Sequence, residues 1–155
     1  MRAGESGEQM SGKEKIAAVL LTLTAVVYGI IPLIVDIGPT HILHPAWSPH
    51  ARLHVVWQIS VNTMLGLLAV LLIWWPGANR QLRLKIAALL GCIALGGFVV
   101  AALTLHLYAG AFSEPGGVPP VGGVDANVLA FTPTLAIQLI ALVLVLIPRR
   151  KPAPM

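Results

Sequence analysis

Four long apolar runs, separated by polar segments, dominate the pattern of this chain. Twenty helical residues, each rising about 1.5 Å, match the roughly 30 Å hydrocarbon core of a bilayer. The pattern predicts an all-α integral membrane four-helix bundle over residues 16–147, with a flexible tail over residues 1–15 and a basic tail over residues 148–155. The predicted helices cover residues 16–35, 49–75, 86–108 and 126–147.

Polar residues recur at every fourth position on the second predicted helix. Ser48 suits an N-cap and Pro49 the first helical residue, so the helix is expected to begin there. Polar groups inside a membrane usually face the bundle interior or a wet cavity, which is what we expect of this face. Its members form one slowly drifting stripe: His50, His54, Gln58 and Asn62.

The first and fourth predicted helices carry similar polar faces. Hydrogen bonds between helices are one role for such side chains, and a cavity that takes a small apolar substrate is the other. We expect Gln58 and Asn62 to line such a cavity together with Tyr28, Thr134 and Gln138. The two faces contain Thr24, Tyr28, Pro32 and Asp36 on the first helix, and Asn127, Phe131, Thr134 and Gln138 on the fourth.

The composition agrees with a membrane protein. Apolar residues make up 57% of the chain and charged residues only 10%, against roughly half and a quarter in soluble domains. The mean hydropathy is +0.84. The single cysteine, Cys92, lies in an apolar run, which excludes an intramolecular disulfide.

The basic residues predict the orientation in the membrane. The net charge of +4 suggests nucleic acid only superficially, because the Lys and Arg residues cluster at the ends of apolar runs. Nine of the ten lie in the two tails and the middle turn, and Arg52 alone lies on the other side. By the positive-inside rule both termini are cytoplasmic. We therefore expect the lipid bilayer, and no nucleic acid, as a partner.

The opposite face collects the ionisable chemistry, and residues 36–54 hold four of the five histidines. His50 and His54, at i and i+4 on one helix, could share a metal ion, with His106 as a further ligand. Histidines hydrogen-bonded to water at the lipid headgroup boundary are the alternative. His41 and His44 are the two histidines least expected to take part.

Haem is a more specific form of the metal hypothesis. A single histidine can be the axial ligand of haem b while apolar helices hold the macrocycle. His54, which enters the bundle above Gln58 and Asn62, is the best candidate for that ligand. Arg52 could pair with a haem propionate, or with Asp36 or another carboxylate at the rim.

Two further segments carry structural predictions. Gly91, Gly96 and Gly97 permit close helix packing on the third predicted helix, and they predict a homo-oligomer. The glycine-rich loop over residues 109–125 is expected to form a plain hairpin rather than a mobile lid. A kink is expected near Pro133 in the fourth helix.

The segment from Tyr28 to Trp57 contains Pro32, Asp36 and the sequence Pro49-His50-Ala51-Arg52. With these residues, the first two predicted helices resemble a group of uncharacterised bacterial four-span membrane proteins. The resemblance implies a multi-pass protein of the bacterial inner membrane. It implies no activity.

A second resemblance is more distant. Ala51-Arg52-Leu53-His54, followed by Asn62, is similar to a motif of styrene oxide isomerase, and Gly123-Val124-Asp125 with Pro133 resembles its fourth span. That family is a small four-span membrane enzyme that binds haem b and isomerises epoxides to carbonyl compounds. The resemblance implies a haem ligand at His54 and a substrate contact at Asn62 or Gln58.

Three functional hypotheses follow. The first is a membrane enzyme with haem b or another histidine-bound transition metal at the extracytoplasmic ends of its helices, with epoxide-isomerase-like or oxidoreductase activity. Asn62, Gln58 and Asp36 are its catalytic candidates, His54 and Arg52 bind the cofactor, and His54, His50 and His106 hold the metal. The second is a non-enzymatic membrane subunit or a metal- or haem-handling assembly factor. The third is an acid–base isomerase that uses a histidine with Asp36 or Asp125.

Overall fold

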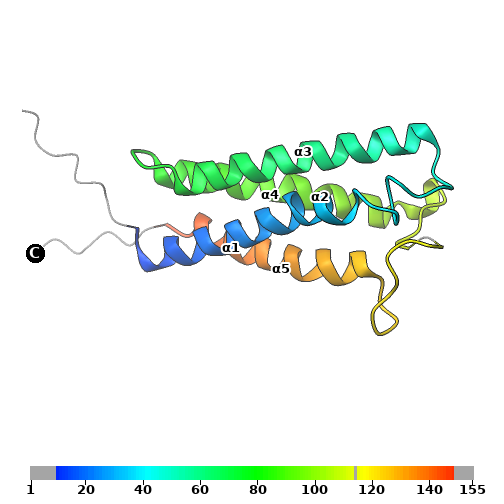
Figure 1. The fold of residues 1–155 in the computed structure, drawn as a ribbon. Helices are drawn as coiled ribbons and strands as arrows, with labels where there is room; N and C mark the ends of the chain where they lie inside the picture. Colours follow the sequence, from blue (N-terminus) through cyan, green and yellow to red (C-terminus); the bar gives the residue numbers. More distant parts are fainter. Residues whose placement is uncertain (1–9, 114, 149–155) are drawn as a thin grey trace, which may run out of the picture.

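The computed structural model describes residues 10–113 and 115–148 as an all-helical bundle (Figure 1). The tail residues 1–9, Glu114 and the basic residues from Arg149 to Lys151 lie outside the described residues. The elements are α1 (Gly12–Gly29), α2 (Ile31–Val35), α3 (Pro49–Trp74), α4 (Arg80–Leu103), the 3-10 turn η1 (Leu105–Leu107) and α5 (Ala126–Leu146).

Four helical segments in the described chain are long and apolar enough to cross a membrane. The first segment combines α1 and α2, which are separated at Ile30, and Pro32 lies in the first turn of α2. The other three segments are α3, α4 and α5. Large apolar side chains are exposed along all four, as lipid-facing surfaces require. The bundle therefore has the architecture of a multi-pass membrane protein, as the apolar runs predict.

Local capping decides where the helices begin. The Ser48 side chain accepts a hydrogen bond from the Ala51 N–H and Pro49 is the first helical residue, which confirms the predicted start of α3. α1 begins at Gly12, ahead of the expected Ile16, because Ser11 and Glu14 form a reciprocal capping box.

The third predicted helix is displaced towards the N-terminus. α4 begins at Arg80 rather than at residue 86, because Gly77 and Asn79, both at positive φ, complete the turn after α3 within a few residues. Arg83 stabilises this turn by donating to the backbone carbonyls of Leu72 and Trp75. At its other end α4 stops at Leu103, and residues 105–107 form the separate turn η1.

The helices form a ring in which α1 contacts α3 and α5, and α4 contacts the same two. Figure 1 shows the start of α1 and the end of α5 at the same end of the bundle. Close approach of α1 and α3 depends on Gly29 and Gly66, whose Cα atoms face each other. A Cβ at Gly66 would lie 3.0 Å from the Ala25 carbonyl oxygen.

One fully buried amide joins three helices in the centre of the bundle. The Gln138 side chain on α5 accepts from the Thr24 hydroxyl at 2.6 Å and donates to the Ala88 carbonyl at 2.7 Å. Gly91 leaves the space that this amide occupies, since a Cβ there would lie 2.6 Å from its nitrogen. Both ends of the amide are satisfied, as burial in an apolar interior requires.

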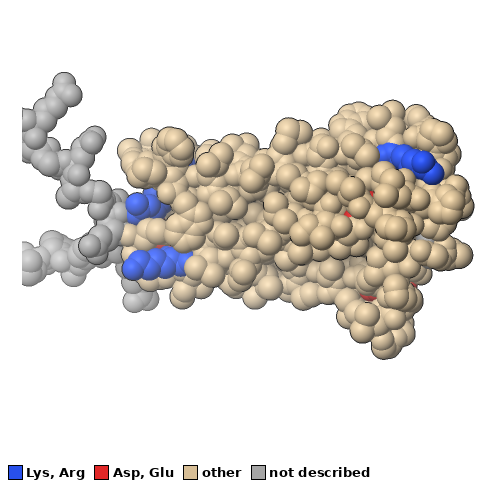
Figure 2. Space-filling model, viewed as in Figure 1, with Lys and Arg blue, Asp and Glu red and all other residues tan. Residues whose placement is uncertain are grey.

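Charge is distributed unevenly between the two ends of the bundle. Figure 2 shows Lys and Arg side chains gathered at the end where α1 begins, with a separate basic side chain at the opposite end. The described residues of the first group are Lys13, Lys15, Arg80, Arg83 and Lys85, and Arg52 belongs to the opposite end.

Candidate functional site

A cavity of about 670 Å³ lies at the end of the bundle away from the basic cluster. Its walls come from the end of the first span, the loop after α2, the start of α5 and the loop between η1 and α5. This volume suits a small organic molecule. The polar and aromatic side chains that line it include Asp36, Thr40, His41, Trp47, Phe112, Ser113, Asn127 and Phe131.

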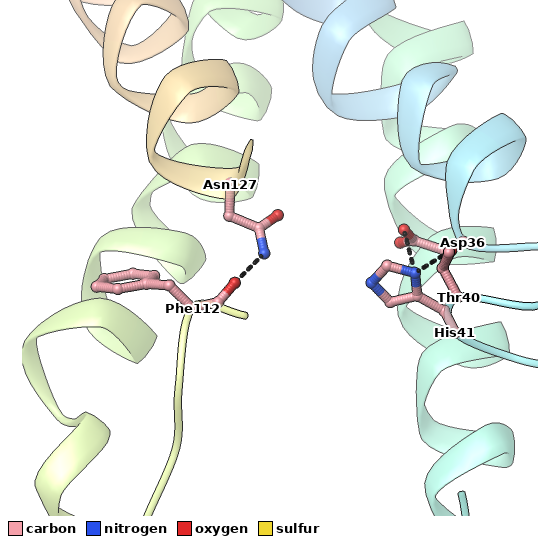
Figure 3. A network of polar contacts seen from close by, with 5 residues as sticks. All are labelled: Asp36, Thr40, His41, Phe112 and Asn127. Carbon is pink, nitrogen blue, oxygen red and sulfur yellow. Dashed lines mark hydrogen bonds and ion pairs between the residues drawn. The ribbon is translucent and has the colours of Figure 1, made fainter. Parts of the chain in front are cut away.

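Asp36, Thr40 and His41 form a polar group on one wall. The Thr40 hydroxyl lies 3.1 Å from Nδ1 of His41, and Oδ1 of Asp36 lies 3.7 Å from the same nitrogen. Figure 3 shows the other ring nitrogen, Nε2, turned away from this pair and towards the opposite wall. Trp47 packs edge-on against the ring, with centroids 5.6 Å apart. Nδ1 is therefore held by protein groups while Nε2 faces the cavity.

Asn127 stands on the opposite wall. Its amide nitrogen donates to the carbonyl oxygen of Phe112 at 2.9 Å. The amide oxygen then points away from Phe112, towards the side of the cavity that holds His41 (Figure 3). Phe131 extends the apolar part of the wall and stacks on Phe98, with ring centroids 4.5 Å apart.

The environment of Asp36 alters its ionisation. Partial burial raises the pKa of this carboxyl, and the adjacent His41 acts in the opposite direction. The carboxyl follows the last residue of α2 and is one-quarter exposed. A raised pKa means that the folded state binds the proton more tightly than the unfolded chain, so the free energy of unfolding falls as the pH rises above the ordinary value of 3.8.

This ionisation gives a prediction for Asp36→Asn. The amide removes the cost of burying a charge at neutral pH, so we expect thermal stability at pH 7 to equal or exceed that of the wild type. We also expect less change in stability between pH 4 and pH 7. Thermal unfolding in detergent at both pH values measures this. Marked destabilisation at pH 7 would mean that the bond to His41 outweighs the burial cost.

The stripe on α3 does not line this cavity. His50, His54 and Gln58 are exposed on the outside of the bundle, and Asn62 is half-buried. Nε2 of His50 lies 3.0 Å from Nε2 of His54, and the Gln58 amide donates to Oδ1 of Asn62 at 3.0 Å. The polar side chains of the stripe therefore hydrogen-bond to one another along the surface of α3.

The remaining predicted ligands are apart from this pair. His106 lies in η1 with its side chain exposed, and within residues 10–113 and 115–148 no three His, Cys, Asp or Glu side chains are grouped to hold a metal ion. Arg52 donates to the backbone carbonyl of His44 at 3.0 Å rather than to Asp36. The structure thus joins His50 to His54 and leaves His106 outside the pair.

The expected cavity around Tyr28, Thr134 and Gln138 is filled by helix packing. All three are buried, and Gln138 makes the bonds between helices described above. None of them lines the cavity at the end of the bundle. The alternative role, hydrogen bonding between helices, is the one that the structure shows for Gln138.

The cavity brings in two residues that were not expected to act. The sequence places His41 among the histidines least expected to take part, and it gives Asn127 only as part of a polar helix face. The position of Asp36 at the end of the first stripe was the available signal, because it places a carboxylate at the start of the histidine loop. The loop over residues 109–125 lines the cavity, and near its end a single antiparallel bridge joins Val121 to Val124.

The comparisons identify the chain by family. No curated protein and no solved structure matches it. The model of a family of unknown function, DUF6640, matches residues 20–151, which include most of the first span, the other three spans and both walls of the cavity. The chain belongs to the DUF6640 family of unknown function.

Proposed function

We propose that this protein is a membrane-embedded acid–base enzyme, an isomerase that moves a proton within a small apolar molecule. The observation that carries the proposal is the orientation of His41, whose Nδ1 faces Thr40 and Asp36 while Nε2 faces a cavity of about 670 Å³. A carboxylate that orients one imidazole nitrogen leaves the other placed for proton transfer, a recurrent arrangement in acid–base catalysis.

The step needs no co-reactant. With the proton on Nδ1, directed at Asp36, Nε2 of His41 takes a proton from a C–H bond beside a carbonyl group, and the bonding electrons pass into the carbonyl as an enolate. The carboxylate of Asp36 stabilises the imidazolium that forms. The proton on Nε2 can exchange with solvent, and in a simple ketone it returns to the same carbon. Where the enolate is conjugated with a double bond or carries an α-hydroxyl group, protonation at a different carbon gives an isomer of identical composition.

Exchange of substrate hydrogen with solvent tests this proposal. Protein in nanodiscs is incubated in D₂O with a panel of apolar ketones, phenylacetone and 2-hydroxypropiophenone among them, and deuterium is measured by mass spectrometry. We expect incorporation above the rate in empty nanodiscs, and retention of that rate in His54→Ala. Incorporation no faster than in empty nanodiscs across the panel would contradict the proposal.

A histidine-bound transition metal, or haem b, on α3 is the second candidate. The specific observation in its favour is the 3.0 Å separation of the His50 and His54 Nε2 atoms. Tetrahedral ligation by two imidazoles at about 2.1 Å requires a separation only slightly larger. The larger haem macrocycle does not fit a single copy, because His54 is exposed on the outside of the bundle.

The metal candidate predicts a difference between two histidine variants. His54→Ala should lose bound metal or haem, whereas His44→Ala should keep it, and both should reach the membrane because insertion depends on the apolar spans. Elemental analysis and a visible spectrum of the purified proteins measure this. Equal metal content in both variants, or none in the wild type, would exclude a metal at His54 and leave a docking subunit as the remaining non-catalytic candidate.

A second copy of the chain is the proposed partner of the outer surface. A Cβ added at Gly96 or Gly97 would meet no atom of the described chain within 4 Å, so this part of α4 is open to a neighbour. Small residues let helices approach closely in membranes. Crosslinking in intact membranes should yield dimers or higher species, and monomer alone would contradict a homo-oligomer.

The proposed orientation places the cavity outside the cytoplasm, with both termini inside, in the inner membrane of a bacterium. The charge asymmetry between the two ends supports this orientation. A cysteine at Ser48, which caps α3 beside the cavity end, should react with an impermeant thiol reagent after the outer barrier of whole cells is permeabilised. Reaction only after lysis of the inner membrane would reverse the orientation.

A further inference from the structure

The cavity offers hydrogen-bond acceptors on two facing walls. On one wall, Nδ1 of His41 faces Thr40 and Asp36, and in the tautomer that the proposed function requires, with the proton on Nδ1, Nε2 is an acceptor that faces the cavity. On the other wall, one N–H of the Asn127 amide donates to the Phe112 carbonyl, and the amide oxygen faces the cavity as an acceptor. A ligand that supplies a donor can therefore bond to an acceptor on either wall.

The rest of the lining restricts the body of that ligand. Phe112 and Phe131 lie on the cavity wall beside Asn127, and Val27, Ile31 and Val35 face it from the first span. Among the residues that the structure describes, no Lys or Arg side chain lines the cavity. This lining therefore offers no cation for an anionic ligand, and its apolar area favours a hydrocarbon or aromatic body.

We infer that the cavity takes a small apolar molecule bearing a hydroxyl group, and that this hydroxyl donates to the amide oxygen of Asn127. The inference rests on the proposed function, because His41 then acts on the C–H bond beside that hydroxyl. An apolar α-hydroxy ketone has both groups. Removal of its C–H proton gives an enediolate, in which the hydroxyl proton passes to the former carbonyl oxygen. Return of the first proton to the former carbonyl carbon then exchanges the positions of carbonyl and hydroxyl with no other reactant.

A pair of ligands that differ only at the hydroxyl tests this inference. Binding of 2-hydroxypropiophenone and of its methyl ether, 2-methoxypropiophenone, is measured on wild-type protein in nanodiscs, with empty nanodiscs subtracting partition into lipid. One hydrogen bond to a neutral acceptor predicts that the hydroxy ketone binds about 3- to 10-fold more tightly. Equal binding of the two, or no binding of either above lipid, would overturn the inference.

Two variants test whether the preference for the hydroxy ketone comes from Asn127. Asn127→Leu removes the acceptor and should bring the two ligands within about twofold of each other, while Gln58→Leu, on the outer face of α3, should keep the wild-type difference. A preference that survives Asn127→Leu would overturn the assignment to this residue. Deuterium exchange without a hydroxyl preference would leave the proton-transfer function standing and reject only the substrate class.

Discussion

Replacing His41 by phenylalanine should lower deuterium incorporation by about 10²- to 10⁴-fold, the usual contribution of a positioned acid–base group. Phenylalanine keeps a ring against Trp47, so the wall of the cavity is preserved while Nε2 is lost. Binding of the apolar ligand should change far less than the rate. The exchange rate of His41→Phe at saturating ligand is compared with that of the wild type. The thermal stability of both proteins is measured to show that the variant is folded.

His44→Phe is the matched control for this prediction. His44 lies three residues away in the same loop, outside the lining of the cavity, with its Nδ1 accepting from the Ala46 N–H. Its variant should exchange at close to the wild-type rate. A rate in His41→Phe within a few-fold of the wild type would show that another group takes the proton.

The largest effect on stability is expected at Gly91. A methyl group there would lie 2.6 Å from both polar atoms of the buried Gln138 amide, so the amide must move and lose its bonds to Thr24 and Ala88. Overpacking and the lost bonds together should destabilise Gly91→Ala by about 1–3 kcal/mol. Unfolding of the protein in mixed micelles by increasing denaturing detergent measures this change.

Gly96→Ala provides the comparison on the same helix. A methyl group at Gly96 meets no atom of the described residues within 4 Å. In micelles that keep the chain monomeric, the variant should therefore stay within about 1 kcal/mol of the wild type, the size of the helix-propensity gain. Wild-type stability in Gly91→Ala would show that Gln138 has another position of equal energy.

The helices were predictable because their signals are local. Span length follows from apolar runs, and the start of α3 follows from Ser48 and Pro49. The polar stripe on α3 was expected to face the bundle interior and does not, and this difference also has a local cause. Four residues of an α-helix advance about 400°, so each step of four rotates the stripe by roughly 40°. His50, His54 and Gln58 consequently face outwards, and only by Gly66 has the face turned towards α1.

The cavity itself could be predicted only in part. Asp36, one of the expected catalytic residues, does line it, because the first stripe ends at that position. His41 and Asn127 face each other across the cavity although they are more than eighty residues apart in the sequence. Their placement depends on how α5 packs against α1. No spacing along the chain encodes such a juxtaposition. The choice among five histidines therefore needed the folded arrangement.

The most direct test of the central claim is the proton position on His41, measured by nitrogen NMR of protein labelled at histidine, with the resonance assigned by its loss in His41→Phe. The account predicts a neutral ring with hydrogen on Nδ1, and an Nε2 signal that shifts when 2-hydroxypropiophenone is added. In Asp36→Asn the preference for Nδ1–H should weaken. A ring in the wild type that carries its hydrogen on Nε2, or an Nε2 signal unmoved by saturating ligand, would contradict a proton-transfer role for this cavity.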